Sequence, residues 1–178
     1  MKRTLQVAAV FLLVSCTVES TRPLTAASAA KADPALPGTW VSTDKDHLKF
    51  VVTAREATVR IVVSGGDRDP MTLEGYVSVL APDLKVLNLR AIEDGKPSPT
   101  WLFVRYAVNA NGTIDTWLIN ENLASDALNK GTLKGHRGQY GGVTLEDTPE
   151  KVIAFLTKGR REDTFSPLMT LTRSKAAP

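Results

Sequence analysis

The chain has 178 residues, of which 43% are hydrophobic and 23% are charged, a balance typical of one folded domain with short extensions. Its formal charge is +3, but Lys2 and Arg3 lie in a segment that we expect to be removed, and taking them from the 22 basic residues leaves 20 against 19 acidic ones. Because no run of Lys or Arg with interleaved aromatic residues is present, the composition excludes an electrostatic nucleic-acid binder. The single cysteine, Cys16, excludes a disulfide within the chain.

Residues 1–15 have the features of an export signal. A basic start at Lys2 and Arg3 precedes an apolar stretch over residues 5–14, which is too short to cross a bilayer. The tetrapeptide Leu13-Val14-Ser15-Cys16 then resembles the lipobox of bacterial lipoproteins. That resemblance implies cleavage before Cys16, a diacylglyceryl group on its thiol and an acyl chain such as palmitate on its amine. Two or three acyl chains would hold the protein permanently at a membrane.

The segment after Cys16 is predicted to be a tether. The next residue is Thr17 rather than Asp, which by resemblance to enterobacterial sorting implies an outer-membrane location, facing the periplasm of a Gram-negative host. Residues 17–35 are rich in Ala, Ser, Thr and Pro and have no apolar periodicity. We therefore expect residues 16–35 to form a lipidated cysteine and a disordered tether. The alternative, a short helix over residues 26–31, would have nothing apolar with which to pack.

Residues 36–173 have the pattern of one β-rich domain. Short apolar and β-branched segments separated by turn residues predict strands over residues 38–43, 48–53, 57–64, 71–80, 84–92, 100–108, 113–119 and 165–172. Within the fourth segment, alternation puts Met71, Leu73, Val77 and Val79 on the inward face. Helical spacing predicts two short helices before the last strand, over residues 121–130 and from residue 147 to Gly159. Residues 174–178 are predicted to be a disordered tail.

Sequential short strands joined by tight turns predict a mainly β fold. An antiparallel meander of about eight strands would close into a barrel or half-barrel, because closure removes exposed strand edges. The interior of such a barrel is either filled by side chains or holds one small ligand. Trp101 and Phe103 oppose Leu102 and Val104 along one strand, which indicates a wall covered on both faces. The two late helices would cover one end or one side.

The segment Leu36-Pro37-Gly38-Thr39-Trp40 resembles the Gly-x-Trp motif that opens the first strand of lipocalin-like barrels. The resemblance implies that Trp40 plugs the closed end and that Arg173, near the last strand, packs across it by a cation–π contact. The chain is also similar to small proteobacterial lipoproteins, in its Trp-Leu-x-x-Arg-Tyr strand (residues 101–106) and its helix over residues 148–156. That likeness implies lipoprotein status and architecture, and no activity.

No catalytic, metal-binding or cofactor-binding site is predicted. His47 stands in an Asp-x-Asp-His sequence, interpreted as a solvated turn rather than a metal site. His136 lies in a Gly-rich loop, without the pattern of a hydrolase nucleophile nearby. The adjacent Arg160 and Arg161 are interpreted as a solvated helix end. The three tryptophans are interpreted as core residues, with a ligand pocket as the alternative.

Two classes of function follow from these expectations. The first is a membrane-anchored module that binds a small apolar molecule or a lipid tail inside the barrel. The alternative is an envelope lipoprotein that docks on another protein and holds no ligand. An enzyme is not expected, because neither a nucleophile–base pattern nor ligand spacing is found.

Overall fold

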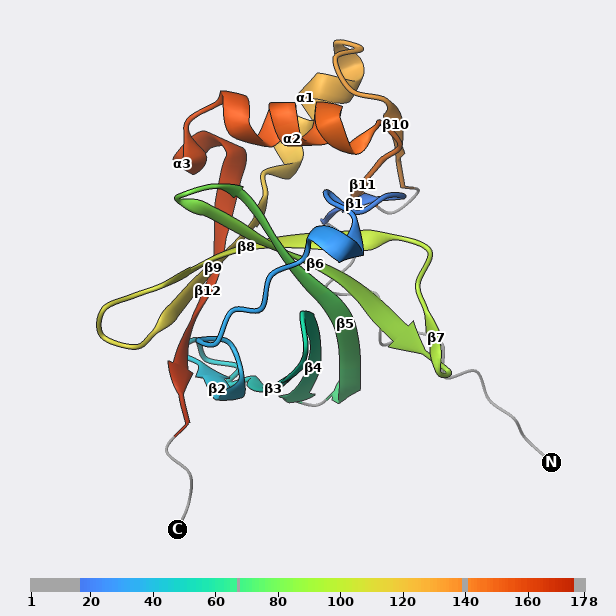
Figure 1. Cartoon of the computed structure of the whole chain (residues 1–178). Coiled ribbons are helices and arrows are strands. Elements are labelled where there is room, and N and C mark those ends of the chain that lie inside the picture. The colour runs from blue at the N-terminus through green and yellow to red at the C-terminus, as the bar shows by residue number, and fades with distance from the viewer. Residues whose placement is uncertain (1–16, 67, 139–140, 175–178) are drawn as a thin grey trace, which may run out of the picture.

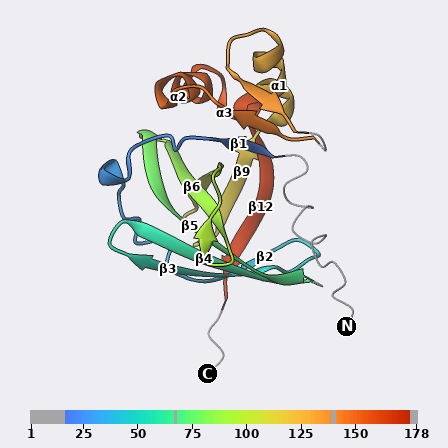
Figure 2. The same ribbon diagram turned by 90° about the vertical axis from the view of Figure 1, so that its right-hand side faces the viewer.

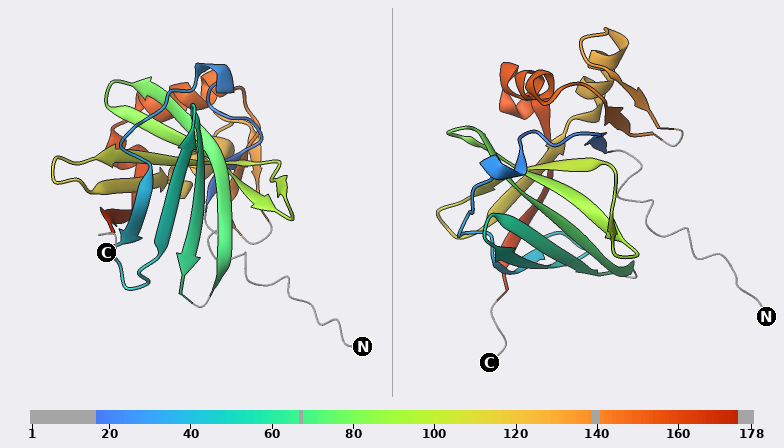
Figure 3. Two further views of the ribbon diagram at one scale, coloured as in Figure 1. Left: turned by 60° about the horizontal axis from the view of Figure 1, so that its bottom comes forward. Right: turned by 45° about the vertical axis from the view of Figure 1, so that its right-hand side comes forward.

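The structure is a computed structural model that describes residues 17–66, 68–138 and 141–174. The export signal and Cys16 lie outside the described residues, as does the predicted tail apart from Ser174. The described chain is mainly β, and eight antiparallel strands close into a barrel, as the sequence predicted (Figure 1 and Figure 3). The barrel order is β2-β3-β4-β5-β6-β8-β9-β12, and β12 pairs back onto β2.

Most of the barrel strands begin and end within about two residues of the predicted segments. Their bounds are β2 (Gly38–Ser42), β3 (Lys49–Arg55), β4 (Thr58–Gly65), β5 (Arg68–Ala81), β6 (Leu84–Glu93), β8 (Trp101–Val108), β9 (Ile114–Ile119) and β12 (Phe165–Arg173). The strands alternate, so that every second side chain enters the barrel. Val59, Ile61 and Val63 of β4, for example, lie in the buried cluster that fills the interior.

Val79, predicted to point inward with Val77, is not buried in the barrel. Val77 is buried inside the barrel, and Met71 and Leu73 pack against the same cluster, but Val79 is 45% exposed. The register of the β5–β6 ladder shifts between Val79 and Ala81, just before the turn that joins the two strands. Val79 pairs in register with Lys85 before that shift, so it keeps the face of Val77 and is exposed because it lies at the end of the ladder rather than in the packed interior.

A second layer covers one side of the barrel. It contains the three helices, which lie together above the barrel in Figure 1 and Figure 2, and the short strand β1. β1 joins this layer to the barrel, because it pairs antiparallel with β8 and parallel with β11. The remaining elements are β1 (Val18–Ser20), η2 (Ala27–Ala29), β7 (Lys96–Pro97), α1 (Glu121–Asn129), β10 (Gly135–Arg137), β11 (Val143–Leu145), α2 (Pro149–Lys158) and α3 (Arg161–Thr164).

The barrel wall is therefore covered on both faces, and the protein has two apolar cores. Val104 of β8 lies in the interior cluster, whereas its neighbour Phe103 lies in an outer cluster between the barrel and the helices. Leu156 of α2 and Leu145 of β11 are fully buried in that outer cluster. The apolar residues on both faces of this strand, noted in the sequence, are explained by the two cores.

The prediction of a disordered tether over residues 16–35 is wrong for the described part of that segment. Val18 belongs to β1, and Leu24 is 1% exposed in the outer core. Residues 21–37, called the strap below, then run over the barrel wall to the start of β2, with η2 on the way (Figure 1). The domain consequently includes residues 17–35 and does not start at Leu36. A few apolar side chains filling single sites, without periodicity, are enough to order this segment.

Candidate functional site

One end of the barrel is closed by the Gly-x-Trp segment and the last strand. The Trp40 side chain is 2% exposed, and its Nε1 donates to the carbonyl oxygen of Leu36 at 2.8 Å. The guanidinium of Arg173 lies over the Trp40 ring, 4.5 Å from the ring centroid. Arg173 also donates to the carbonyl oxygens of Pro37 and Ala35, at 3.3 Å each. This is the arrangement that the lipocalin-like motif implied for Trp40 and Arg173.

Gly38 is required at this closure for two reasons. Its φ of +142° is a backbone conformation that residues with a side chain rarely adopt. A Cβ at this position would also lie 2.6 Å from Nη1 of Arg173, which is closer than real contacts allow. The glycine therefore lets Arg173 reach across Trp40.

The barrel interior is largely filled by side chains. Beside Trp40 there is an apolar cavity of about 50 Å³, and Leu36, Phe50 and Tyr106 are among the residues that line it. Pockets for small molecules usually have volumes of roughly 300–1,000 Å³. The cavity could hold one or two waters by volume, but its walls offer them almost no polar surface. Among the three tryptophans, Trp40 lines this cavity, whereas Trp101 and Trp117 pack on the outer core.

Asp33 ties the strap to the barrel. Its Oδ2 accepts hydrogen bonds from Lys85 Nζ at 2.8 Å and from the Tyr106 hydroxyl at 2.7 Å, and its Oδ1 accepts from the backbone of Ala35. Burial raises the pKa of Asp33, but these hydrogen bonds outweigh it and hold that pKa below its ordinary value. Burial and the bonded Asp33 carboxylate raise the pKa of Tyr106. Asp33 is therefore an anion at neutral pH and Tyr106 a neutral donor.

Asn88 ties the middle of the strap to the barrel wall. Its side chain is 0% exposed and accepts from the backbone N–H of Leu24 at 2.9 Å. The same amide donates to the Ser78 hydroxyl at 2.8 Å and to the carbonyl oxygen of Tyr76 at 3.3 Å. The Tyr76 hydroxyl in turn donates to the carbonyl oxygen of Thr25. These contacts hold residues 24 and 25 against β5 and β6.

The fold begins directly after the predicted lipidation site. The carbonyl oxygen of Thr17 accepts from the backbone N–H of Val143 at 3.0 Å, and Val18 is paired with Val143 in the sheet. Arg137, at the end of β10, is also paired with Val143, so it lies at the same end of this three-stranded arrangement. No free segment therefore separates Cys16 from the sheet.

The histidines and adjacent carboxylates form no evident catalytic centre. His47 lies in the loop between β2 and β3, where Asp44 accepts from Ser42 and from the backbone of Asp46. His136 pairs with Glu146 at 3.1 Å on the surface. Within the described residues, no group of three or more His, Cys, Asp or Glu side chains could hold a metal ion. In the same part of the chain, no helix is both long and apolar enough to cross a membrane.

Sequence reasoning missed several residues with structural or electrostatic roles. Asp33 and Asn88 carry no motif and are recognisable only from their contacts. Arg90 lies over the ring of Trp101 at 4.3 Å, and Arg105 lies over the ring of Trp117 at 4.2 Å. The alternation of inward and outward residues along each strand could have predicted that both arginines lie on the outer face of the barrel. It could not have predicted that each lies over an aromatic ring.

Comparison with protein-family models, with curated proteins and with solved structures finds no match. Membership of the lipocalin-like or the proteobacterial lipoprotein family therefore stays a prediction.

Proposed function

We propose that this protein is a lipid-anchored docking module of the bacterial envelope, held at the outer membrane by lipid on Cys16 and facing the periplasm. The observation that carries the proposal is that the sheet begins right after Cys16, the predicted lipidation site, with no flexible segment of chain between them. Thr17 already contributes a backbone hydrogen bond to the sheet, and β1 starts at Val18. A tether of 19 residues would have given a mean reach of roughly 25 Å. Without it, lipid on Cys16 would hold one end of the β1-β11-β10 arrangement against the bilayer.

Such an anchor would give the domain a defined orientation for a protein partner. Arg137 lies at the end of β10 that is level with Val18, and its side chain is exposed. Its positive charge would favour anionic lipid headgroups by about 1 kcal/mol. The strap element η2 lies on the opposite side of the barrel from the start of β1 (Figure 2). A partner would therefore meet the surface around η2 rather than the end with Arg137.

The experiment has two steps, which test the anchor and its geometry separately. First, mass spectrometry of the N-terminal peptide should find acyl chains on Cys16, and Cys16→Ser should release the protein from membranes. Second, the acylated protein, labelled with a fluorophore through Arg137→Cys or through Ser28→Cys in η2, is incorporated into vesicles that contain a lipid-attached quencher. The label at position 137 should be quenched, whereas the label at the exposed position 28 should not.

The outcomes separate the two parts of the proposal. An unmodified Cys16 would exclude the lipoprotein. Acylation with equal, weak quenching at both positions would exclude the fixed orientation and restore the tether. Crosslinking of the acylated protein in intact envelopes should then trap a partner, and failure to trap any would count against docking.

A second candidate function is the carriage of a small apolar ligand, favoured by the apolar cavity beside Trp40. With a volume of about 50 Å³, this cavity would have to enlarge by movement of Leu36 and its neighbours. Native mass spectrometry of the chain purified from its own periplasm, without detergent, tests this function. A reproducible extra mass that leaves on denaturation would favour the carrier, and a clean apo mass would favour docking.

A further inference from the structure

Two arginines, Arg105 of β8 and Arg161 of α3, lie where the barrel meets the helical layer, a place called the seam below. Each has a buried N–H group without a hydrogen-bond acceptor. Within residues 17–66, 68–138 and 141–174, two buried side-chain nitrogens lack a hydrogen-bond partner, and they are Nε of Arg105 and Nε of Arg161. Buried donors in folded proteins almost always have a partner, and an exception requires an explanation such as a missing water or ion. Both exceptions here belong to cations in one region, which indicates that an anion completes them.

Arg105 is held in place by aromatic rings rather than by an acid. It lies on the outer face of β8, with its guanidinium 4.2 Å from the ring centroid of Trp117 and 5.6 Å from that of Phe165. It forms no hydrogen bond or ion pair with another described residue. Burial and the nearby charge of Arg161 lower the pKa of Arg105, so the two guanidiniums are close enough to repel one another, while the carboxylates of Asp83 and Glu162 act on that pKa in the opposite direction.

Arg161 is only partly satisfied by its surroundings. At the start of α3, its Nη1 donates to the carbonyl oxygens of Leu156 and Thr157, at 3.5 and 3.4 Å, where α2 ends. The Asp83 carboxylate lies 3.5 Å from its Nε, but without the alignment of a hydrogen bond. Asp83 is 67% exposed, so water screens most of its charge.

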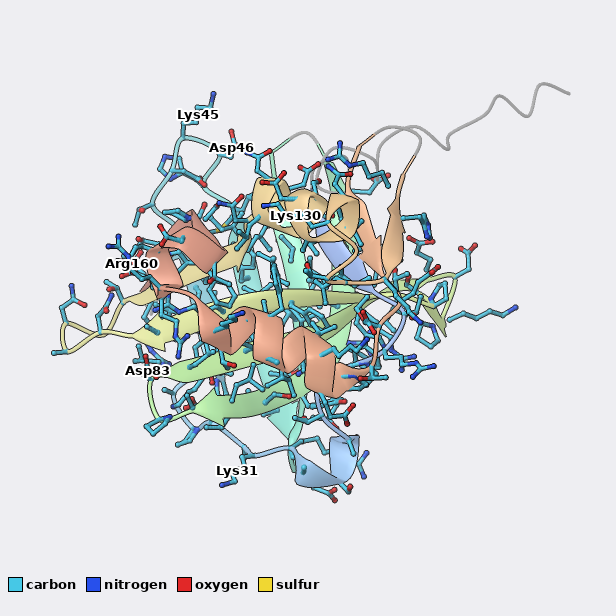
Figure 4. All side chains as sticks on the ribbon, turned by 90° about the horizontal axis from the view of Figure 1, so that it is seen from above. Lys31, Lys45, Asp46, Asp83, Lys130 and Arg160 are labelled. Carbon is cyan, nitrogen blue, oxygen red and sulfur yellow. The ribbon has the colours of Figure 1, made fainter. Side chains whose placement is uncertain are left out.

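The solvated helix end that the sequence indicated fits Arg160 and not Arg161. Arg160 is 73% exposed and pairs with Glu162 and Asp163, whereas the Arg161 side chain is 23% exposed. Figure 4 shows Arg160 and Asp83 on the same side of the molecule, beside the end of α2 that leads into α3. The Arg161 side chain is thus partly accessible to solvent, next to the exposed carboxylate of Asp83.

We propose that Arg105 and Arg161 together bind a phosphate group at this seam. A guanidinium gives directional, charge-assisted hydrogen bonds to phosphate, and the several oxygens of a phosphate can accept from two guanidiniums at once. The charge of a phosphate would also offset the repulsion between the two arginines, in competition with the exposed carboxylates of Asp83 and Glu162. The group could belong to a small soluble phosphate compound or to a lipid headgroup, and the site does not depend on whether Cys16 is acylated.

The test uses the full chain with Cys16→Ser, so that no anchor obscures binding. One arm titrates inorganic phosphate by calorimetry, and the other measures binding to phosphatidylcholine vesicles with and without phosphatidic acid. Arg105→Gln and Arg161→Gln should each weaken binding roughly tenfold or more in the arm where the parent binds. Arg105→Lys, which keeps the charge but loses the Nε donor, should also weaken it. Binding in the first arm would indicate a soluble ligand, and binding in the second alone would indicate a headgroup.

The matched control is Arg90→Gln. Arg90 also stacks on a tryptophan of the outer wall, Trp101 at 4.3 Å, but its Nε is not a buried donor without a partner. Its loss should leave phosphate binding unchanged. The proposal is overturned if the parent binds in neither arm, if the substitutions of Arg105 and Arg161 have no effect, or if Arg90→Gln weakens binding equally. If Arg105→Gln does not fold, Arg105→Lys and Arg161→Gln still decide the matter.

Discussion

Replacing Asn88 by alanine should destabilise the protein by about 2–4 kcal/mol and loosen the strap before the barrel. The buried N–H of Leu24 would lose its acceptor, which costs about 1–3 kcal/mol because water cannot reach it. The space left by the amide in a closely packed wall adds about 1 kcal/mol. The Ser78 hydroxyl loses less, because it keeps its hydrogen bond with Thr25 at 2.6 Å. A typical domain has only 5–15 kcal/mol of stability, so the effect should be easy to measure.

Urea denaturation would give the change in the free energy of unfolding, and amide hydrogen exchange would locate it. The exchange of Leu24 should accelerate more than that of residues in β8. A suitable control is Asn111→Ala, because Asn111 also takes part in two hydrogen bonds, both with Thr113, but in an exposed turn. Water can replace those bonds, so the control should cost less than about 1 kcal/mol. A change below about 0.5 kcal/mol for Asn88→Ala, or equal effects of both substitutions, would refute the role of Asn88 as a buried hub.

Three further predictions concern the strap and the closed end. The pKa of Asp33 is lower in the fold than in the unfolded chain. Its contribution to stability is therefore present above about pH 4 and is lost as the pH falls below that value. Asp33→Asn should flatten this part of the curve of unfolding free energy against pH, measured by urea titration. Arg173→Ala should cost about 1–2 kcal/mol in thermal or urea unfolding, with a change in Trp40 fluorescence, and an unchanged stability would contradict the cation–π contact. Gly38→Ala should cost about 1–3 kcal/mol, and combining it with Arg173→Ala should cost less than the sum, because the clash is with Arg173.

The barrel could be predicted from local pattern because each strand carries its own signal. β4 alternates Val59, Ile61 and Val63 with mostly polar neighbours, and turns that contain glycine follow β4, β6 and β8. The burial of both faces of β8 could also be predicted from the sequence, because the neighbours Phe103 and Val104 point to opposite faces and both are large and apolar. The exposure of Val79 could not be predicted, because it depends on where the packed interior ends along β5 rather than on the alternation of β5 itself.

The closed end was predictable because a motif specifies it, whereas the polar contacts elsewhere have no local signal. Trp40 and Arg173 are 133 residues apart in the chain, yet the Gly-x-Trp resemblance was enough to pair them. The side-chain partners of Asp33 are 52 and 73 residues away in the chain, and the partners of Asn88 are 10 to 64 residues away. The residues next to Asp33 and Asn88 in the sequence give no sign of these contacts. Arg161 was misjudged because an arginine after a helix is usually solvated; its burial depends on the barrel wall that it faces.

The boundary of the domain is also testable, because residues 17–35, which include β1 and most of the strap, are part of the folded structure. β1 is the strand between β11 and β8, so removing it separates the β10–β11 hairpin from the barrel. A chain that begins at Leu36, the boundary expected from composition, would also lack Asp33 and leave the buried Tyr106 hydroxyl without its acceptor. We expect a chain of residues 17–178 to unfold cooperatively, and one of residues 36–178 to lose stability and expose the outer core to a hydrophobic dye. If both unfold at the same temperature with equal cooperativity, residues 17–35 merely lie on the surface, and the proposed fixed attachment of the domain to a lipid anchor would lose its physical basis.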